Sequence, residues 1–145
     1  MADFDRIPID SIHIDPELKP QSDEHLLELM EAAMAGNLPV YFGAVPVSHV
    51  VPFDLDYRPD KHPVGAQAIE AALEDWKQGR YRYLLVYPRG VWFVVSDHYI
   101  SLFAALRGRV EYLPCWILGK PENPQIKDLQ GPIAEADIPK ILGMG

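Results

Sequence analysis

The stretch from Tyr83 to Leu118 constrains the fold more than any other part of the chain, because it contains three apolar runs. Residues 84–87 and 91–95 are near-continuous runs of aliphatic and aromatic side chains, a pattern typical of strands buried on both faces. The Arg89-Gly90 pair joins these two runs and predicts a hairpin. The third run, residues 112–118, predicts a further buried strand.

A short helix is predicted between the second and the third of these strands. Four apolar residues share one helix face at positions i, i+3, i+4 and i+7, namely Tyr99, Leu102, Phe103 and Leu106. Ser96 and Asp97 precede the helix, and either can accept a hydrogen bond from its first N–H groups. Gly108 is expected to take the left-handed conformation after the helix end. Any ligand is expected at the polar turn before this helix.

The flanking segments predict further elements. These are an edge strand over Phe4–Ile14, a helix capped by Ser22 and ended by Gly36-Asn37, a strand over Val40–Val51 broken by Gly43 and Pro46, and a helix that begins at Pro63 and ends at Gly79. Four prolines after Leu118 preclude a long helix. We expect an irregular tail there, whose apolar residues dock on the body or on a partner: Ile133, Ile138, Ile141 and Leu142.

Together these elements predict an α/β (α+β) fold with a small mixed sheet and three main helices. We expect one domain over residues 1–145. Residues 1–50 would form an N-terminal strand-helix-strand extension, residues 51–119 the core unit, and residues 120–145 the irregular tail.

The net charge of −8 is unevenly distributed. Residues 1–57 carry 2 basic and 11 acidic side chains, residues 58–109 carry 8 basic and 5 acidic, and residues 110–145 carry 3 basic and 5 acidic. Non-specific nucleic-acid binding is disfavoured, because the chain as a whole would be repelled by a phosphate backbone. A basic patch in the middle of the chain remains compatible with this composition.

Several function classes are disfavoured by composition. No apolar run approaches the roughly 20 residues that cross a bilayer, so we expect no membrane span and a cytoplasmic protein. The single cysteine, Cys115, lies in an apolar strand and is expected to be a buried thiol. No Cys/His spacing resembles a zinc site, so no metal and no obligatory cofactor are predicted.

From Val51 onward the order is a strand, an Arg-Pro loop, a helix, a hairpin, a capped short helix and a closing strand with a proline. This order, with the words VPFDLDYRP, GVWFVVSDHYISLFAALRG and LPCWILG, resembles the ParB/sulfiredoxin-like superfamily over residues 51–119. The resemblance implies a nucleotide or phosphate site at the turn before the short helix. It also implies that the loop with Arg58 and Lys61 lies near the same pocket.

In that superfamily a glycine at the turn admits the phosphate and an arginine grips it, at a helix N-terminus that favours anions. The five corresponding positions are Asp97, His98, Tyr99, Ile100 and Ser101. Asp97 fits the motif, but His98 replaces the glycine and Ser101 replaces the arginine. Tyr99 stands where sulfiredoxin has its cysteine, which excludes sulfiredoxin-type reduction. The resemblance therefore implies a degenerate phosphate-binding motif.

The ligand-binding candidates are Arg58, Lys61, Asp97, His98, Tyr99 and Ser101. Asp97 and His98 are also the catalytic candidates, because a histidine tuned by a carboxylate can act as a general base. The plainer interpretation is that Asp97 caps the helix and His98 is a surface residue. Tyr99 equally fits a core position, and Arg58 and Lys61 equally fit a solvated loop.

Three function classes follow. The preferred one is a non-catalytic module that binds a ligand or a protein partner. The second is a ParB-like nuclease or nucleotide-hydrolysing enzyme that uses the Asp97-His98 turn. The third is an acidic interaction protein whose front segment binds a basic or nucleic-acid-binding partner; exposed glutamates of the first predicted helix fit this class, namely Glu24, Glu28 and Glu31.

Overall fold

The computed structural model describes residues 20–80 and 83–142. Its α-helices are α2 (Glu24–Met34), α3 (Pro63–Lys77), α4 (Tyr99–Arg107) and α5 (Ile138–Ile141). Its strands are β1 (Val40–Pro46), β2 (Val50–Pro52), β3 (Leu84–Arg89), β4 (Trp92–Val95), β5 (Tyr112–Leu118) and β6 (Lys127–Gln130). Short 3-10 turns are η3 (Val47–His49), η4 (Pro59–Lys61) and η5 (Glu135–Asp137).

The strands form one mixed sheet in the order β2-β4-β3-β5-β1-β6. The β2–β4 and β3–β5 pairs are parallel, and the other neighbouring pairs are antiparallel. The predicted α/β class with a small mixed sheet and three main helices is confirmed. β1 lies inside the sheet between β5 and β6, so this part of the predicted N-terminal extension is integral to the sheet.

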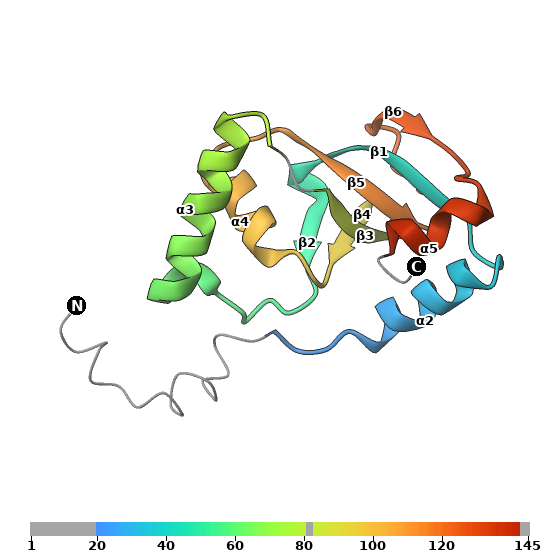
Figure 1. Cartoon of the computed structure of the whole chain (residues 1–145), viewed down its shortest axis with the longest axis horizontal. Helices are drawn as coiled ribbons and strands as arrows, with labels where there is room; N and C mark the ends of the chain where they lie inside the picture. The colour runs from blue at the N-terminus through green and yellow to red at the C-terminus, as the bar shows by residue number, and fades with distance from the viewer. Residues whose placement is uncertain (1–19, 81–82, 143–145) are drawn as a thin grey trace.

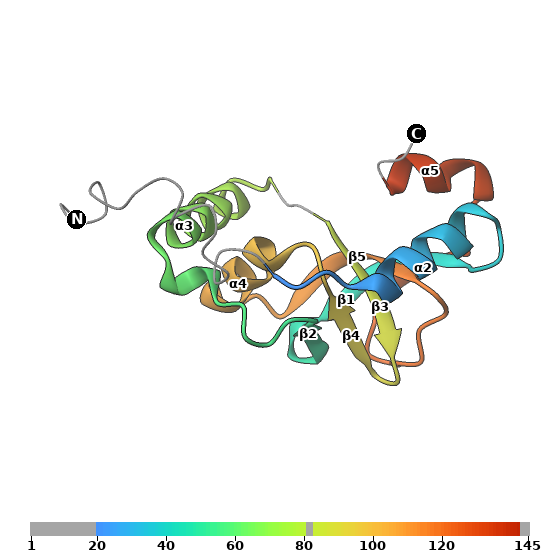
Figure 2. The same ribbon diagram turned by 90° about the horizontal axis from the view of Figure 1, so that it is seen from below.

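Helices cover both faces of the sheet. Leu84 and Val86 of β3 belong to the hydrophobic core that includes residues of α3 and α4. Leu85 and Tyr87 of the same strand belong to the core that includes residues of α2 and α5. Because successive side chains of a strand point to opposite faces, the two cores lie on the two sides of the sheet. Figures 1 and 2 show α3 beside α4 at one end of the molecule and α2 beside α5 at the other.

The hairpin predicted at Arg89-Gly90 is confirmed. β3 and β4 pair in antiparallel register from Val86–Val95 to Arg89–Trp92. Gly90 occupies the turn with φ of +62°, a conformation that glycine adopts without steric cost.

Two of the predicted helix ends are also confirmed. Gly36 follows α2 with φ of +77°, and Gly79 follows α3 with φ of +80°. At the end of α2, the N–H of Gly36 bonds the carbonyl of Ala33 and the N–H of Asn37 bonds that of Ala32. This paired arrangement is the Schellman motif, which satisfies the last carbonyl groups of the helix.

The end of α4 differs from the sequence prediction. Gly108 has φ of −80°, and the left-handed residue is Arg109 with φ of +55°. A Cβ atom at Gly108 would lie 2.8 Å from Cδ1 of Leu73 on α3. The packing of α4 on α3 thus leaves little room for a side chain at Gly108, and the next residue takes the left-handed conformation.

The predicted strand over Val40–Val51 is broken once rather than twice. The break comes after Pro46, where η3 separates β1 from β2. Gly43 lies within β1, and a Cβ there would come 2.7 Å from Cγ2 of Ile126. The prediction of a break at Gly43 was wrong, because this glycine makes room for the segment that precedes β6.

The tail contains more regular structure than predicted. β6 pairs with β1 at the edge of the sheet, and α5 is only 4 residues long, consistent with the expectation of no long helix. Ile138 is 3% exposed and packs in the core beneath α2, and Ile133 and Leu142 pack against the same core. The edge strand predicted over Phe4–Ile14 lies outside the described residues.

Two further expectations concern single features. Cys115 is fully buried, and burial raises the pKa of its thiol far above the ordinary value. Within residues 20–80 and 83–142, no helix is both long enough and apolar enough to cross a membrane.

Candidate functional site

The turn between β4 and α4 is the site that the sequence predicts. Its residue His98 is the N-cap of α4, and its side chain makes no capping hydrogen bond. The Ser96 hydroxyl is buried and donates a hydrogen bond to the carboxylate of Asp23. Asp97 is exposed. The prediction that Ser96 or Asp97 caps α4 was wrong, because the Ser96 side chain turns to a buried carboxylate and the Asp97 side chain turns to solvent.

Tyr99 and Ser101, two of the predicted ligand-binding residues, are buried. Tyr99 is 3% exposed and Ser101 is 4% exposed. The Tyr99 hydroxyl accepts a hydrogen bond of 2.9 Å from the N–H of Asp54, and its ring meets that of Tyr57 edge-on at 4.9 Å. Burial raises the pKa of the Tyr99 hydroxyl. These side chains therefore support the turn from within the fold, and their role in ligand binding stays a prediction.

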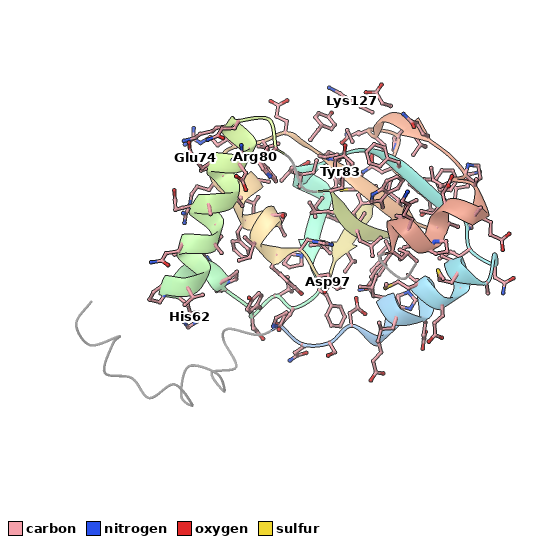
Figure 3. All side chains as sticks on the ribbon, in the orientation of Figure 1. His62, Glu74, Arg80, Tyr83, Asp97 and Lys127 are labelled. Atoms are coloured by element: carbon pink, nitrogen blue, oxygen red, sulfur yellow. The ribbon has the colours of Figure 1, made fainter. Side chains whose placement is uncertain are left out.

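Asp97 lines a hollow of about 300 Å³ between the start of α2 and the turn before α4. This hollow, here called the acidic hollow, is lined by residues 20–23, by Leu26, Leu27 and Met30 of α2, and by Ser96 and Asp97. Figure 3 shows Asp97 on the side of α4 that faces the chain leading into α2. Among the described residues, its lining contains two carboxylates and no lysine or arginine, so its formal charge is negative and favours cations.

Asp23 is the buried carboxylate of the acidic hollow. It is 7% exposed, and it joins three elements that are distant in the sequence. Its Oδ1 accepts the N–H of Leu26 at 3.3 Å, which makes it the N-cap of α2. Its Oδ2 accepts the hydroxyl of Tyr87 at 2.7 Å and that of Ser96. The predicted cap at Ser22 was therefore wrong by one residue, because Asp23 is the side chain that reaches both the helix and the sheet.

The hydrogen bonds around Asp23 keep it ionised. Burial raises the pKa of its carboxyl, but bonds from Ser96, Tyr87 and the N–H of Leu26 outweigh that effect, and the net pKa is lowered. Burial and the neighbouring Asp23 carboxylate raise the pKa of Tyr87 to about 12. At neutral pH the cluster therefore holds a carboxylate anion and a neutral phenol donor.

Arg58 lies in a different hollow. This one, here called the arginine hollow, has a volume of about 330 Å³ and is lined by Arg58, Asp60, Phe103, Leu106 and Arg107. It lies between the loop at η4 and the last turn of α4. The residues that the sequence assigned to one pocket are thus divided, with Asp97 near the start of α4 and Arg58 near its end.

The remaining candidates are placed as follows. Lys61 is exposed at the end of η4 and lines neither hollow. His98 is half-buried at the start of α4, and its carbonyl accepts the N–H of Leu102. Among the described residues, no group of three or more His, Cys, Asp or Glu side chains is arranged to hold a metal ion.

Sequence reasoning missed the residues that complete each hollow. Asp23 falls in the helix predicted after Ser22, and Tyr87 falls in the predicted strand 84–87. No contact between the two residues was predicted. Arg107 and Phe103 were assigned only to the short helix. The one available signal was chemical, since Asp23 is a strong capping residue that directly follows Ser22. Nothing local indicates the partners of Asp23, which lie 64 and 73 positions away.

Comparison of this chain with protein-family models, with curated proteins and with solved structures finds no match.

Proposed function

We propose that this chain is a non-catalytic binding domain whose acidic hollow takes a cationic group, such as a lysine or arginine side chain of a protein partner. The observation that carries the proposal is the ionised, buried Asp23 at the floor of a hollow that also has apolar walls. A buried anion of this kind attracts a cation more strongly than a solvated one, because the surrounding dielectric is lower.

The two chemistries of the hollow match the two parts of a basic side chain. Leu26, Leu27 and Met30 offer an apolar wall to an aliphatic stem, and Leu27 is 56% exposed. Asp97 at the rim offers an exposed carboxylate to the charged head. Asp23 already accepts hydrogen bonds from Ser96, Tyr87 and backbone N–H groups of α2, so it acts on the charged head through its negative charge.

The enclosing segment is held in place by a separate contact. The N–H of Gln21 donates to Oδ2 of Asp54 at 2.9 Å, which ties the chain before α2 to the loop after β2. This bond restrains the segment before α2, which reduces the ordering entropy lost when a ligand binds.

The negative formal charge of the acidic hollow opposes the phosphate ligand that the ParB/sulfiredoxin-like resemblance implies for this turn. A nuclease or nucleotide-hydrolysing enzyme based on Asp97 and His98 would have to bind phosphate beside Asp23. We therefore rank nuclease or nucleotide hydrolysis second, and it stays a prediction.

The test is a titration of the protein with a short capped Gly-Lys peptide, followed by protein NMR at low ionic strength. We expect shifts at Leu27, Ser96 and Asp97, and a dissociation constant that Asp97→Asn weakens about fivefold, which corresponds to roughly 1 kcal/mol. Glu74→Gln is the matched control, because it removes the same charge from an exposed site on α3.

Two results would contradict the proposal. One is equal binding of the same peptide after acetylation of its lysines. The other is an equal loss of affinity in Asp97→Asn and Glu74→Gln, which would indicate non-specific attraction. CTP, ATP and ADP are titrated in parallel, and shifts confined to Asp97 and His98 would instead favour the nucleotide-hydrolysing alternative.

A further inference from the structure

The arginine hollow at the far end of α4 brings together two guanidinium groups from separate elements. Arg58 comes from the loop before η4, and Arg107 from the last turn of α4. Both line the same hollow with the ring of Phe103 and the exposed side chain of Leu106. We propose that this hollow binds a phosphate monoester, with the phosphate between the two guanidinium groups and the ester's apolar group against Leu106.

Arg58 is held in a fixed orientation. Its Nε and Nη2 donate to the two carboxylate oxygens of Asp60 at 3.0 and 2.8 Å. The guanidinium carbon also lies 5.7 Å from the centre of the Phe103 ring, a cation–π contact. A guanidinium has five N–H donors, and Asp60 takes two of them. The Nη1 edge is left for a second oxyanion, since the described residues place no acceptor on it.

Arg107 is held in a similar way but by one bond. Its Nη1 donates to Oε1 of Glu70 on α3. Within the described part of the chain its Nε and Nη2 have no acceptor, so they remain for a ligand. Because Arg58 and Arg107 are each oriented by a carboxylate, binding a phosphate would cost little additional side-chain entropy.

The carbonyl groups at the end of α4 do not compete for these donors. The carbonyls of Ala104, Ala105 and Leu106 accept the N–H groups of Gly108, Val110 and Arg109. The helix end would otherwise present unpaired carbonyl oxygens beside Arg107 and disfavour an anion. Because these carbonyls are already bonded, the N–H groups of the two guanidinium groups stay available to an anion.

A phosphate must compete with the two carboxylates already present, because the charges of the two ion pairs sum to zero. Asp60 and Glu70 neutralise one positive charge each, and both arginines are partly exposed, at 46% and 40% of their side-chain surface. A phosphate monoester carries nearly two negative charges at neutral pH and can bridge both arginines, which neither carboxylate does. Lys61 is exposed directly after η4 and adds to the positive potential of this end.

The test is NMR detection of the arginine Nε–H signals while phenyl phosphate is added to the full chain. We expect the signals of Arg58 and Arg107 to shift together. Arg107→Gln and Arg58→Gln should each weaken the affinity at least tenfold, or about 1.4 kcal/mol. Arg107→Lys keeps the charge but loses the planar fork, and it should weaken binding too.

Arg80→Gln is the matched control. Arg80 is also paired with a carboxylate, that of Asp75 at 2.6 Å, but it lies outside the arginine hollow. This variant should bind phenyl phosphate as the wild type does, and so should Asp97→Asn, which separates this proposal from that for the acidic hollow.

Three outcomes would overturn the inference. One is the absence of shifts at Arg58 and Arg107 in the wild type, a result that needs no variant to fold. The second is an equal loss of affinity in Arg80→Gln, which would show general charge attraction. The third is benzoate binding as tightly as phenyl phosphate, which would exclude the phosphate class. We expect phenyl phosphate to bind more tightly than inorganic phosphate, because its ring contacts Leu106. Equal binding of the two would refute the contact with Leu106.

Discussion

The two hollows at the ends of α4 use charge in opposite ways. In the acidic hollow the charge is that of Asp23, which is buried and bonded to α2, β3 and the end of β4. In the arginine hollow the charges are surface pairs, Arg58 with Asp60 and Arg107 with Glu70. We therefore expect substitution of Asp23 to change both stability and ligand binding, and substitution of the surface arginines to change ligand binding with little effect on stability.

The signs of the two hollows also follow the direction of α4. The exposed Asp97 precedes its N-terminus, and Arg107 lies in its last turn. Each sign complements the helix macrodipole, which is positive at the N-terminus and negative at the C-terminus. A contribution to helix stability is therefore present at both sites, and Asp23 adds to it by bonding three separate elements.

The contrast between the two hollows predicts its largest change in stability for substitution of Asp23. We expect Asp23→Ala to lower the free energy of unfolding by about 3 kcal/mol, because a helix cap is lost and two buried hydroxyl groups lose a charged acceptor. Urea denaturation measures the change. Asp97→Ala, on the rim of the same hollow, should stay within about 0.5 kcal/mol of the wild type. Equal effects of the two variants would show that Asp23 has no special structural role.

The next effect concerns the end of α4 that carries Arg107. Gly108→Ala should destabilise by less than about 1 kcal/mol, because the added methyl group meets only the terminal Cδ1 of Leu73 on α3, which can shift. Arg109→Gly should stabilise by about 0.5 kcal/mol, because glycine accepts the left-handed conformation more easily. Thermal unfolding of both variants checks the pair. If Arg109→Gly were less stable than Gly108→Ala, this explanation of the α4 end would be wrong.

The smallest effect is a pH dependence that distinguishes the two carboxylates. The pKa of Asp23 is lowered from 3.8 in the folded protein, so its stabilising contribution is present above that pH and is lost as the pH falls through the folded pKa. The stability advantage of the wild type over Asp23→Asn should therefore shrink in acid, as followed by urea denaturation at several pH values.

The pKa of Asp60 is lowered in the same direction, by its hydrogen bonds from Arg58. Its pair is partly exposed and therefore screened by solvent, so Asp60→Asn should show a weaker pH-dependent difference. A larger acid effect at Asp60 than at Asp23 would reverse the proposed contrast between a buried and a surface charge.

Much of the fold could be predicted because its signals are local. The hairpin at Gly90 and the helix ends at Gly36 and Gly79 depend on residues that are neighbours in the chain. The error at Gly108 shows the limit of such signals. A glycine after a helix indicates a left-handed residue, but here Gly108 keeps a right-handed conformation and Arg109 takes the left-handed one.

The candidate site could be predicted only in part. Asp97 and Arg58, which the sequence singled out, each line a hollow, and their role as ligand-binding residues stays a prediction. Their assignment to one pocket depended on the resemblance to a family whose motif is incomplete here. The partners that define each hollow, Asp23 and Arg107, come from other helices, and no local pattern relates them to the turn.

The class of fold, most of the helices and strands, and the uneven distribution of charge follow from the chain alone, because periodicity and turn chemistry act over a few residues. Which charges meet depends on the three-dimensional packing. The carboxylate of Asp23 gains its hydrogen bonds from strands distant in the chain, and Arg58 meets the ring of Phe103 only when η4 packs on α4. Such contacts depend on how the elements are arranged in space, which no short stretch of sequence specifies.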